Sequence, residues 1–280
     1  MLITGGNSGI GKATAMALAR RNARVIITSR DAAAGGRAAA DIARTAGATV
    51  EVMDLDLASF DSIRRCAASV EARRYDLAVL INNAGVFIGR RRATADGFEL
   101  TLGVNHLGHF LLTGLLIDRL RACAPARIIN VSSGAHHRAE RGVEELRVGR
   151  NRYRATDAYA QSKLANVLFS RELARRLEGT GVTAYALHPG VVATRIAQDG
   201  DTRIAGYLWK AAKPFQLSPD EGAQTSVFVA TEPGLGLHSG GYFSEARLAP
   251  VSEAAQDAAA ARRLWVTSER LTGCRFPPSA

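Results

Sequence analysis

The segment LITGGNSGIGK, residues 2–12, is a short apolar strand that runs directly into a glycine-rich turn and then into a helical stretch. Strand, glycine turn and helix in this order form the context in which a dinucleotide-binding loop occurs. Glycines let the backbone turn tightly and approach a pyrophosphate, and a helix N-terminus offers unpaired N–H groups and a positive dipole end. Gly5, Gly9 and Gly11 follow a G-x-x-x-G-x-G spacing rather than G-x-G-x-x-G. For this stretch alone, a plain turn without a ligand is an equal alternative.

Apolar, β-branched segments alternate with helical segments along the rest of the chain. We expect strands at residues 2–4, 25–28, 49–53, 77–81, 127–131, 182–187 and 240–244. We expect helices at residues 12–21, 32–46, 97–120, 159–177 and 252–271, with further helices beginning near 59 and 219. This alternation predicts an α/β protein: a single Rossmann-type, doubly wound parallel sheet with helices on both faces, and one domain over residues 1–280.

The composition is that of an ordinary globular protein, with 47% hydrophobic and 22% charged residues among 280. Its three cysteines form no C-x-x-C pair or disulfide framework, which favours a reducing, cytoplasmic location. The N-terminus lacks a signal-peptide pattern, and no apolar stretch approaches the roughly 18 residues that span a bilayer. The net charge of +10 would suit a nucleic-acid partner. No nucleic-acid motif accompanies it, so we expect a solvated basic surface and no nucleic acid.

The end of the second expected strand carries Ser29, Arg30 and Asp31. In a dinucleotide-binding sheet, an acidic residue at this place holds the adenosine ribose of NAD, whereas an arginine accepts the 2′-phosphate of NADP. Arg30 therefore favours NADP, and NAD is the alternative. Asp31 comes one position later, where it could cap the helix at 32–46 instead.

Several segments follow strands and so should lie at the carboxyl edge of the sheet, where ligands bind in open α/β folds. They are residues 82–85 (Asn-Asn-Ala-Gly), 132–133 (Ser-Ser) and 188–194 (His-Pro-Gly-Val-Val-Ala-Thr). A simple turn is a reasonable alternative for the first of them. Residues of about 195–218 are rich in apolar and aromatic side chains, which suits a lid over a non-polar substrate. A surface helix packed on the body fits that segment equally well.

Tyr159 and Lys163 are four positions apart on an expected helix, so their side chains leave the same face. An ammonium beside a phenol favours the phenolate and lowers its pKa from about 10. That brings the phenol closer to the pH at which a general acid or base works. Y-x-x-x-K alone is short and common, and it more often marks an ordinary amphipathic helix. We expect Thr156 or Asp157 to cap this helix.

The expected helix at 97–120 contains Val-Asn-His-Leu-Gly-His, residues 104–109. A buried asparagine within a helix, here Asn105, needs hydrogen-bond partners or water. His106 and His109 could suggest a metal site. No carboxylate or cysteine set is near them in the sequence, so we predict no metal.

Taken in order, five motifs resemble the short-chain dehydrogenase/reductase family over essentially the whole chain. They are Thr4-Gly5…Gly9-Ile10-Gly11, Asn82-Asn83-Ala84-Gly85, Asn105, Ser132/Ser133 with Tyr159-x-x-x-Lys163, and Pro189-Gly190. Longer stretches at residues 4–11, 104–110, 131–136 and 159–166 are similar to the retinol dehydrogenase and WW-domain oxidoreductase branch, although this sequence contains no WW domain. Each motif alone is weak, whereas the ordered set is specific.

The resemblance implies a role for each matching residue. Tyr159 would give or take the proton at the substrate oxygen, and Lys163 would lower the Tyr159 pKa and bind the nicotinamide ribose. Ser133, rather than Ser132, would orient the substrate oxygen, and Asn105 would hold a water in a proton relay. Further cofactor contacts would come from Gly5, Asn7, Ser8, Gly9, Ile10, Gly11, Arg30, Asp56, Leu57, Asn83, Ala84, Gly85, Pro189, Gly190, Val192 and Thr194.

The sequence thus predicts an NADP-dependent oxidoreductase that transfers a hydride between the nicotinamide and a small apolar alcohol or carbonyl substrate, with Tyr159 as general acid/base. Two other classes stay open: a nucleotide-binding regulatory protein of the same fold without turnover, and a nucleotide-sugar epimerase or dehydratase. Members of the latter class usually have a larger C-terminal part than follows Thr194 here. The family often forms dimers and tetramers, so the resemblance leaves a homo-oligomer open.

Overall fold

The structure, a computed structural model of the chain, describes residues 1–139, 153–190 and 217–277. Within these residues the strands form one eight-stranded sheet in the order β3-β2-β1-β4-β5-β6-β7-β8. They are β1 (Leu2–Ile3), β2 (Val25–Ser29), β3 (Val50–Asp54), β4 (Val79–Asn82), β5 (Ala126–Val131), β6 (Val182–His188), β7 (Tyr242–Ser244) and β8 (Arg247–Leu248). Neighbouring strands are parallel from β3 to β7, and β8 pairs antiparallel with β7. The strand order reverses between β1 and β4, and such a switch point is where doubly wound sheets bind ligands.

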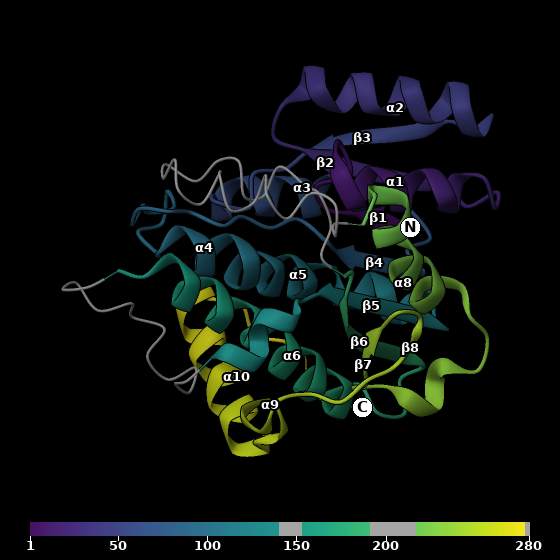
Figure 1. The fold of residues 1–280 in the computed structure, drawn as a ribbon. Helices are drawn as coiled ribbons and strands as arrows, with labels where there is room; N and C mark the ends of the chain where they lie inside the picture. Colours follow the sequence, from purple (N-terminus) through teal and green to yellow (C-terminus); the bar gives the residue numbers. More distant parts are fainter. Residues whose placement is uncertain (140–152, 191–216, 278–280) are drawn as a thin grey trace.

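Helices cover both faces of the sheet (Figure 1). They are α1 (Gly9–Ala19), α2 (Ala32–Ala46), α3 (Phe60–Ala72), α4 (Leu100–Leu102), α5 (Gly108–Ala122), α6 (Ala155–Arg176), α8 (Pro219–Thr231), α9 (Glu253–Gln256) and α10 (Ala258–Thr272). Shorter turns are the π-helical η1 (Gly103–Leu107) and the 3₁₀-helical η2 (Gly134–Arg138) and η6 (Leu235–His238). This arrangement confirms the predicted α/β fold.

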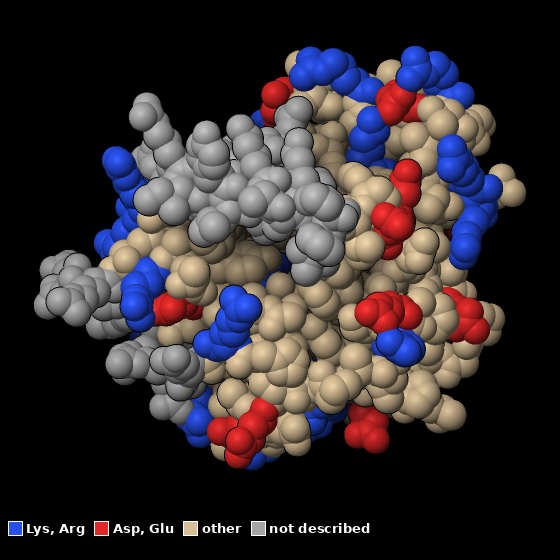
Figure 2. Space-filling model, in the orientation of Figure 1, with Lys and Arg blue, Asp and Glu red and all other residues tan. Residues whose placement is uncertain are grey.

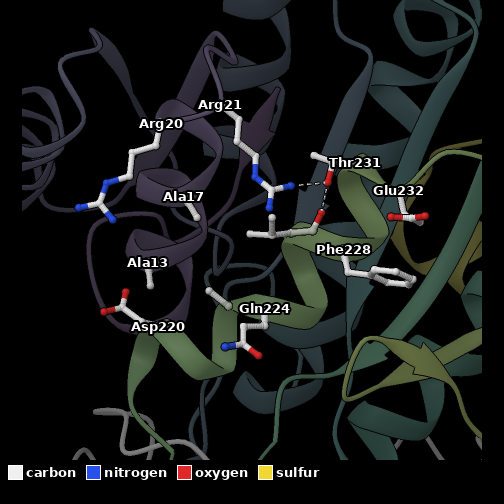
Figure 3. A pocket seen from close by; sticks show the side chains of 11 residues that line it. Ala13, Ala17, Arg20, Arg21, Asp220, Gln224, Phe228, Thr231 and Glu232 are labelled. Carbon is white, nitrogen blue, oxygen red and sulfur yellow. Dashed lines mark hydrogen bonds between the residues drawn. The ribbon is translucent and has the colours of Figure 1, made fainter.

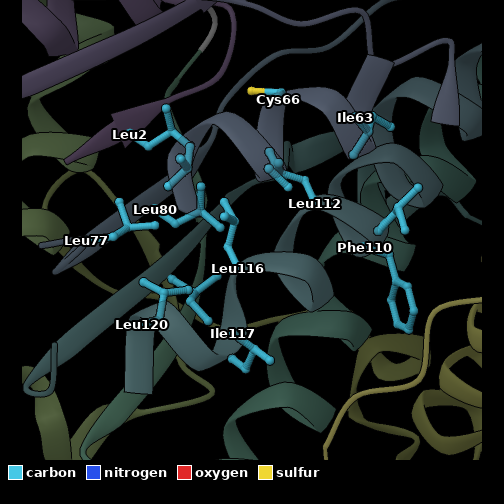
Figure 4. Close-up of a cluster of buried hydrophobic side chains, with 14 of the residues drawn as sticks. Leu2, Ile63, Cys66, Leu77, Leu80, Phe110, Leu112, Leu116, Ile117 and Leu120 are labelled. Carbon is cyan, nitrogen blue, oxygen red and sulfur yellow. The ribbon is translucent and has the colours of Figure 1, made fainter. Parts of the chain in front are cut away.

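Successive strand residues face opposite layers, because the side-chain period of a strand is two residues. Leu2 belongs to a buried cluster with residues of α3, α5 and α6, whereas Ile3 belongs to a cluster with residues of α1, α2 and α8. Figure 4 shows side chains of α5, including Leu116, gathered with Leu77 and Leu80 in the first cluster. Complete burial of one such leucine contributes about 1.5–3 kcal/mol. Burial on both faces explains why the central strands are mostly apolar.

The helix expected at 97–120 begins later and is not uniform. Glu99 caps α4 by accepting hydrogen bonds from the backbone N–H groups of Thr101 and Leu102, and the π-helical turn η1 precedes α5. Among the described residues, Leu100–Ala122 is long and apolar enough by composition to cross a membrane, which corrects the expectation that no stretch is. Because 83% of its most apolar window is buried inside the fold, packing of a core helix accounts for that composition.

One expected helix cap is correct and another is wrong. Asp31 caps α2, as predicted, by accepting a hydrogen bond of 2.9 Å from Ala34 N. The helix that carries the tyrosine, α6, begins earlier than expected, with Arg154 at its N-cap. Thr156 and Asp157 therefore lie inside its first turn, where the Asp157 carboxylate still suits the positive end of the helix dipole.

The C-terminal region differs from expectation at two turns. The strand expected at 240–244 is half of the hairpin β7–β8, whose turn residues Glu245 and Ala246 have φ angles of 52° and 55°. Hairpin turns with positive φ angles usually contain glycine or asparagine, and this turn contains neither. The helix expected at 252–271 is split into α9 and α10, because Asp257 accepts two backbone N–H bonds and starts the second helix.

Candidate active site

The glycine turn between β1 and α1 is folded so tightly that side chains would not fit. Gly5 and Gly9 have φ angles of +64° and +52°, a left-handed region that favours glycine. A Cβ atom on Gly11 would lie 2.5 Å from the carbonyl oxygen of Gly5. Ser8, the N-cap of α1, makes no side-chain capping bond, and the first turn contains no acidic residue. The N-terminus of α1 therefore fits an anion, as the pyrophosphate of a dinucleotide requires.

Thr4 ties this glycine turn to the segment after β4. Its hydroxyl oxygen accepts hydrogen bonds of 2.9 Å from both Asn83 N and Ala84 N. Its carbonyl oxygen accepts another, of 2.8 Å, from Asn83 Nδ2. A Cβ atom on Gly5 would lie 3.0 Å from the Cβ of Ala84. The two glycine-containing segments predicted to bind the cofactor are thus side by side at the switch point of the sheet.

Four other predicted cofactor residues lie in or near the same edge of the sheet. Asn7 and Ile10 are half-buried in the glycine turn. Asp56 follows β3, and its carboxylate accepts a hydrogen bond of 2.9 Å from Ala58 N. Leu57, the next residue, is buried. The loop after β3 is therefore shaped by its own aspartate.

Arg30 is exposed at the end of β2. Its neighbour Asp31 directs its carboxylate to the N-terminus of α2, as described above. The other basic residue close in sequence to the glycines, Lys12, forms an ion pair with Asp41 of α2. Asp31, the acidic residue that would favour NAD, is thus hydrogen-bonded to the backbone of α2, whereas the Arg30 guanidinium is exposed beside the end of β2.

The helix α6 places Tyr159 and Lys163 beside the carboxyl end of β5. The Lys163 ammonium donates a hydrogen bond of 3.0 Å to the carbonyl oxygen of Val131, the last residue of that strand. Its Nζ lies 5.5 Å from the centroid of the Tyr159 ring. A Cβ atom on Gly85 would lie 3.5 Å from the same Nζ, so the segment after β4 also reaches this pair.

Ser132 and Ser133 follow β5 but make different contacts. The buried Ser132 hydroxyl donates a hydrogen bond of 2.7 Å to the backbone oxygen of Lys163 and so holds α6 against the strand. Ser133 is half-buried, accepts a hydrogen bond of 3.2 Å from Ala135 N, and lies near enough to Tyr159 to affect its pKa. Of the two serines, Ser133 is the one placed to share a substrate oxygen with the tyrosine.

Burial dominates the protonation of the tyrosine–lysine pair. It raises the pKa of Tyr159, and the Ser133 hydroxyl acts on that pKa in the opposite direction with smaller effect. Burial also lowers the pKa of Lys163 to about 8. The net pKa of Tyr159 is therefore raised, because loss of water penalises the phenolate, and the lowering of this pKa by Lys163 stays a prediction. At neutral pH the tyrosine is protonated and the lysine carries its charge.

Asn105 is fully buried in the π-helical turn η1. Its Oδ1 accepts a hydrogen bond of 2.8 Å from Val86 N, and its Nδ2 donates to Val86 O and to Ser162 Oγ, both at 3.0 Å. These bonds join the segment after β4 to α6, next to Lys163. Because π-helical turns inside α-helices are frequent at functional sites, the local distortion agrees with a role at the site.

Residues 1–204 match the family model described as short chain dehydrogenase. The chain belongs to this family. Retinol dehydrogenase 12 from Homo sapiens is 49% identical over 277 residues, which cover 99% of this chain and 87% of that protein. Retinol dehydrogenase 11 from Homo sapiens is 46% identical and covers 98% of this chain and 85% of that protein. These relatives confirm the predicted retinol dehydrogenase branch, and the chain is an oxidoreductase that acts on CH–OH groups.

Solved structures agree with this fold. A crystal structure of an uncharacterized protein from Mycobacterium paratuberculosis has a TM-score of 0.78 at 39% identity, covering 99% of this chain and 94% of that one. The Pseudomonas aeruginosa RhlG/NADP active-site complex has a TM-score of 0.69 at 27% identity, covering 86% of this chain and 92% of that one.

The segment after β6 that is predicted to contact the nicotinamide is described only in part in this short-chain dehydrogenase. Within the described residues, Pro189 and Gly190 follow β6. Outside the described residues lie Val192, Thr194 and most of the lid predicted at about 195–218. Gly190 has a φ angle of +86°, and a Cβ atom there would lie 2.4 Å from the side chain of Leu217. The turn after β6 therefore requires glycine where the chain returns before α8.

Sequence reasoning missed the contributions of Thr4, Phe87 and His109. The Phe87 ring packs edge-on against Tyr159, with ring centroids 5.6 Å apart. His109 contacts the Thr4 hydroxyl and the backbone oxygen of Asn105. Among the described residues, no group of three or more His, Cys, Asp or Glu could hold a metal ion. The available signal for His109 was its position one helical turn after Asn105.

A groove of about 440 Å³ lies between α1 and α8 (Figure 3). Small side chains of α1, including Ala13 and Ala17, form one wall, and Arg21 crosses it to donate a hydrogen bond of 2.9 Å to Thr231. None of the predicted catalytic residues lines this groove. The groove results from the packing of α1 against α8 and is not part of the candidate site around Tyr159.

Basic and acidic side chains are interspersed on the face of the dehydrogenase shown in Figure 2. Ion pairs between partly exposed side chains include Arg24 with Glu51 and Arg44 with Asp41. The excess of positive charge is therefore spread over this face rather than gathered into one stripe, as a nucleic-acid interface would require.

Proposed function

We propose that this short-chain dehydrogenase is NADP-dependent, acts on an apolar alcohol or carbonyl substrate, and uses Tyr159 as its general acid/base. The observation that carries the proposal is the grouping at the carboxyl end of β5. There the Ser133 hydroxyl lies near the Tyr159 phenol, and the Lys163 Nζ is 5.5 Å from the centroid of the tyrosine ring. A phenol, a hydroxyl and a cation are the groups needed to stabilise charge on a carbonyl oxygen that is being reduced.

The dinucleotide would be held by the glycine turn, the segment after β4 and Lys163, and it would supply or remove the hydride when bound. As negative charge develops on the substrate oxygen, Ser133 and Tyr159 donate hydrogen bonds to it. Tyr159 is protonated at neutral pH because burial raises its pKa, so it is ready to act as the acid in the direction of reduction. The Lys163 ammonium then stabilises the phenolate that remains.

Preference for NADP is supported by the exposed guanidinium of Arg30 and by the capping role of Asp31. A carboxylate that accepts a backbone N–H of α2 is less available to a ribose hydroxyl. A guanidinium, by contrast, offers a planar fork of donors that matches a phosphate. One structural relative is an NADP active-site complex, which agrees with this preference.

An apolar substrate is supported by two observations. The relatives that align over nearly the whole chain are named retinol dehydrogenases, and retinol is a long apolar alcohol. In this chain the Phe87 ring packs against Tyr159, so an apolar surface borders the proton donor. Apolar pockets with a few well-placed polar groups are the usual form of small-molecule sites.

The test compares Tyr159→Phe with Tyr185→Phe, which removes the same hydroxyl from a buried tyrosine of β6 that donates a hydrogen bond of 2.8 Å to the backbone oxygen of Leu235. NADPH oxidation is followed spectrophotometrically with ketones and aldehydes of graded size and polarity, retinal among them. We expect Tyr159→Phe to reduce kcat by at least about 10²–10⁴-fold. NADPH affinity should stay near that of the wild type, and Tyr185→Phe should lose stability but keep its turnover.

Two results would contradict the proposal. Near-normal turnover by Tyr159→Phe would remove the tyrosine from its role as acid/base. A wild-type protein that binds NADPH tightly but turns over no member of the panel would instead support the nucleotide-binding regulatory class.

A further inference from the structure

His109 lies at the start of α5, between the glycine turn and the π-helical turn that contains Asn105. Its Nε2 is 2.9 Å from the hydroxyl oxygen of Thr4, and its Nδ1 is 3.2 Å from the backbone oxygen of Asn105. The residue is only 2% exposed. One buried side chain therefore contacts both the cofactor-binding half and the catalytic half of the site.

The partners of the ring decide which nitrogen carries the hydrogen. A backbone carbonyl oxygen only accepts, so Nδ1, which faces Asn105 O, must be the N–H donor. Burial lowers the pKa of His109 to about 4, which keeps the ring neutral and makes Nε2 an acceptor. Thr4 then donates its hydroxyl hydrogen to Nε2, and its oxygen accepts the N–H groups of Asn83 and Ala84.

This tautomer gives the Thr4 hydroxyl a single orientation. A hydroxyl has one hydrogen, and two acceptors lie near it: His109 Nε2 at 2.9 Å and the carbonyl oxygen of Ile81 at 3.5 Å. The shorter contact is the stronger hydrogen bond. With the hydrogen directed at the ring, both lone pairs of the oxygen face the segment after β4, as their two bonds require.

We propose that His109 is a positioning residue with two separate actions, one through each ring nitrogen. Through Nε2 it fixes Thr4 and thereby joins the glycine turn to the segment after β4. Through Nδ1 it fixes the backbone of Asn105 and thereby the π-helical turn that aims the asparagine side chain at Ser162. The second action rests on the proposed function, whereas the first concerns cofactor binding alone.

His106, three residues earlier, is a buried histidine whose side chain contacts the C-terminal helix and two aromatic rings. Its Nε2 is 2.8 Å from the Ser268 hydroxyl on α10, and its ring packs against Phe110 and Phe169. It is as deeply buried as His109 but faces the C-terminal helix. His106→Gln and His106→Asn are therefore matched controls for the same substitutions at His109.

Substitution by asparagine or glutamine tests the two ring nitrogens one at a time. The side-chain amide of Asn occupies the position of Nδ1, whereas that of Gln reaches the position of Nε2. We expect His109→Asn to keep the bond to Asn105 and lose the one to Thr4, so Kd for NADPH should rise about tenfold with kcat changed less than about threefold. We expect His109→Gln to show the reverse, with kcat about tenfold lower and Kd nearly unchanged. Fluorescence titration of NADPH gives Kd without turnover, and steady-state rates at saturating cofactor give kcat.

The controls decide between positioning and simple packing. The His106 variants should lower Tm without separating Kd from kcat. The contrary result is that NADPH affinity and kcat fall together in both His109 variants, in proportion to a fall in Tm. That result would mean that the histidine only fills the core, and it would overturn the proposal. Wild-type values of Kd and kcat in both variants would overturn it as well.

A second pair of variants covers the case in which the His109 variants fail to fold. Thr4→Ser keeps the hydroxyl and should bind NADPH like the wild type, whereas Thr4→Val should bind about tenfold more weakly. Equal affinities of these two variants would refute the first action. Because this arm measures binding only, its outcome is independent of Tyr159→Phe, and a failure of the proposed catalytic role would be seen separately.

Discussion

Gly11→Ala places a methyl group where the glycine turn has no room. The added Cβ would lie 2.5 Å from both the Gly5 carbonyl oxygen and Asn83 Nδ2, whereas ordinary van der Waals contact begins near 3.4 Å. The shortfall of 0.9 Å (3.4 − 2.5) must be made up by movement. Since the Gly5 oxygen belongs to the backbone, the turn itself must open. Overpacking of this kind costs about 1–3 kcal/mol of stability.

Gly36→Ala is the matched control. Gly36 lies in α2, and a Cβ atom there would meet nothing within 4 Å. Both substitutions replace a helical glycine, so both gain about 0.5–1 kcal/mol from the lower backbone entropy of the unfolded chain. The difference between the two variants therefore isolates the clash. At roughly 2–4 °C for each kcal/mol, Gly11→Ala should melt several degrees below Gly36→Ala.

The assay has two readouts on the cofactor-free protein: Tm from differential scanning fluorimetry and Kd from NADPH fluorescence titration. We expect Kd to rise at least about tenfold in Gly11→Ala, because opening the turn moves the N–H groups at the start of α1 away from the pyrophosphate. Gly36→Ala should bind like the wild type. If the two variants had the same Tm and the same Kd, the close approach of Gly11 to Gly5 would be refuted.

Three further predictions follow from the contacts described above. Ser133→Ala should lower kcat by roughly 10²-fold, whereas Ser132→Ala should mainly cost about 1 kcal/mol of stability and keep turnover. Steady-state kinetics and Tm measurements distinguish the two variants. Equal losses of kcat would count against the role of Ser133. Lys163 has a pKa of about 8 in the folded chain and 10.5 in the unfolded chain, so the unfolded state binds more protons between these pH values. The stability of the wild type, measured by urea unfolding, should therefore rise from pH 8 to 10.5 relative to that of Lys163→Met. A constant difference across that range would show that the lysine is not desolvated. Arg30→Ala should weaken NADPH by roughly 10- to 100-fold and NADH little; an equal loss for both would overturn the NADP preference.

The sheet and its helices could be predicted from local patterns because each pattern has a local physical cause. The apolar run at 77–81 signals a strand buried on both faces, and Asp31 signals the start of α2. The hairpin after β7 could not be predicted, since its turn uses Glu245 and Ala246 in left-handed conformations that glycine or asparagine normally adopts. There the packing of the sheet edge overrides the preference of the turn residues.

The proximity of Tyr159 and Lys163 could be predicted for the same reason, whereas their protonation could not. Tyr159 and Lys163 are one helical turn apart, and helix geometry alone brings their side chains together. The pKa of Tyr159 depends instead on how much water the whole fold removes from it, including the Phe87 ring packed against it from a distant segment. Sequence spacing indicates the nearby cation but not the desolvation that raises this pKa.

The Thr4–His109 contact shows why the remaining part of the site needs the fold. The two residues are 105 positions apart, and no spacing rule relates them. They meet because β1 and β4 are neighbours at the switch point, which brings the glycine turn under the start of α5. Each then satisfies polar atoms that the other leaves buried: the ring accepts the hydroxyl hydrogen, and the hydroxyl oxygen serves Asn83 and Ala84. Because an unpaired buried polar atom costs about 1–3 kcal/mol, the bonds that hold the glycine turn in shape also stabilise the sheet at that point, so substitutions of Thr4 or His109 should lower Tm in addition to their effects on the site.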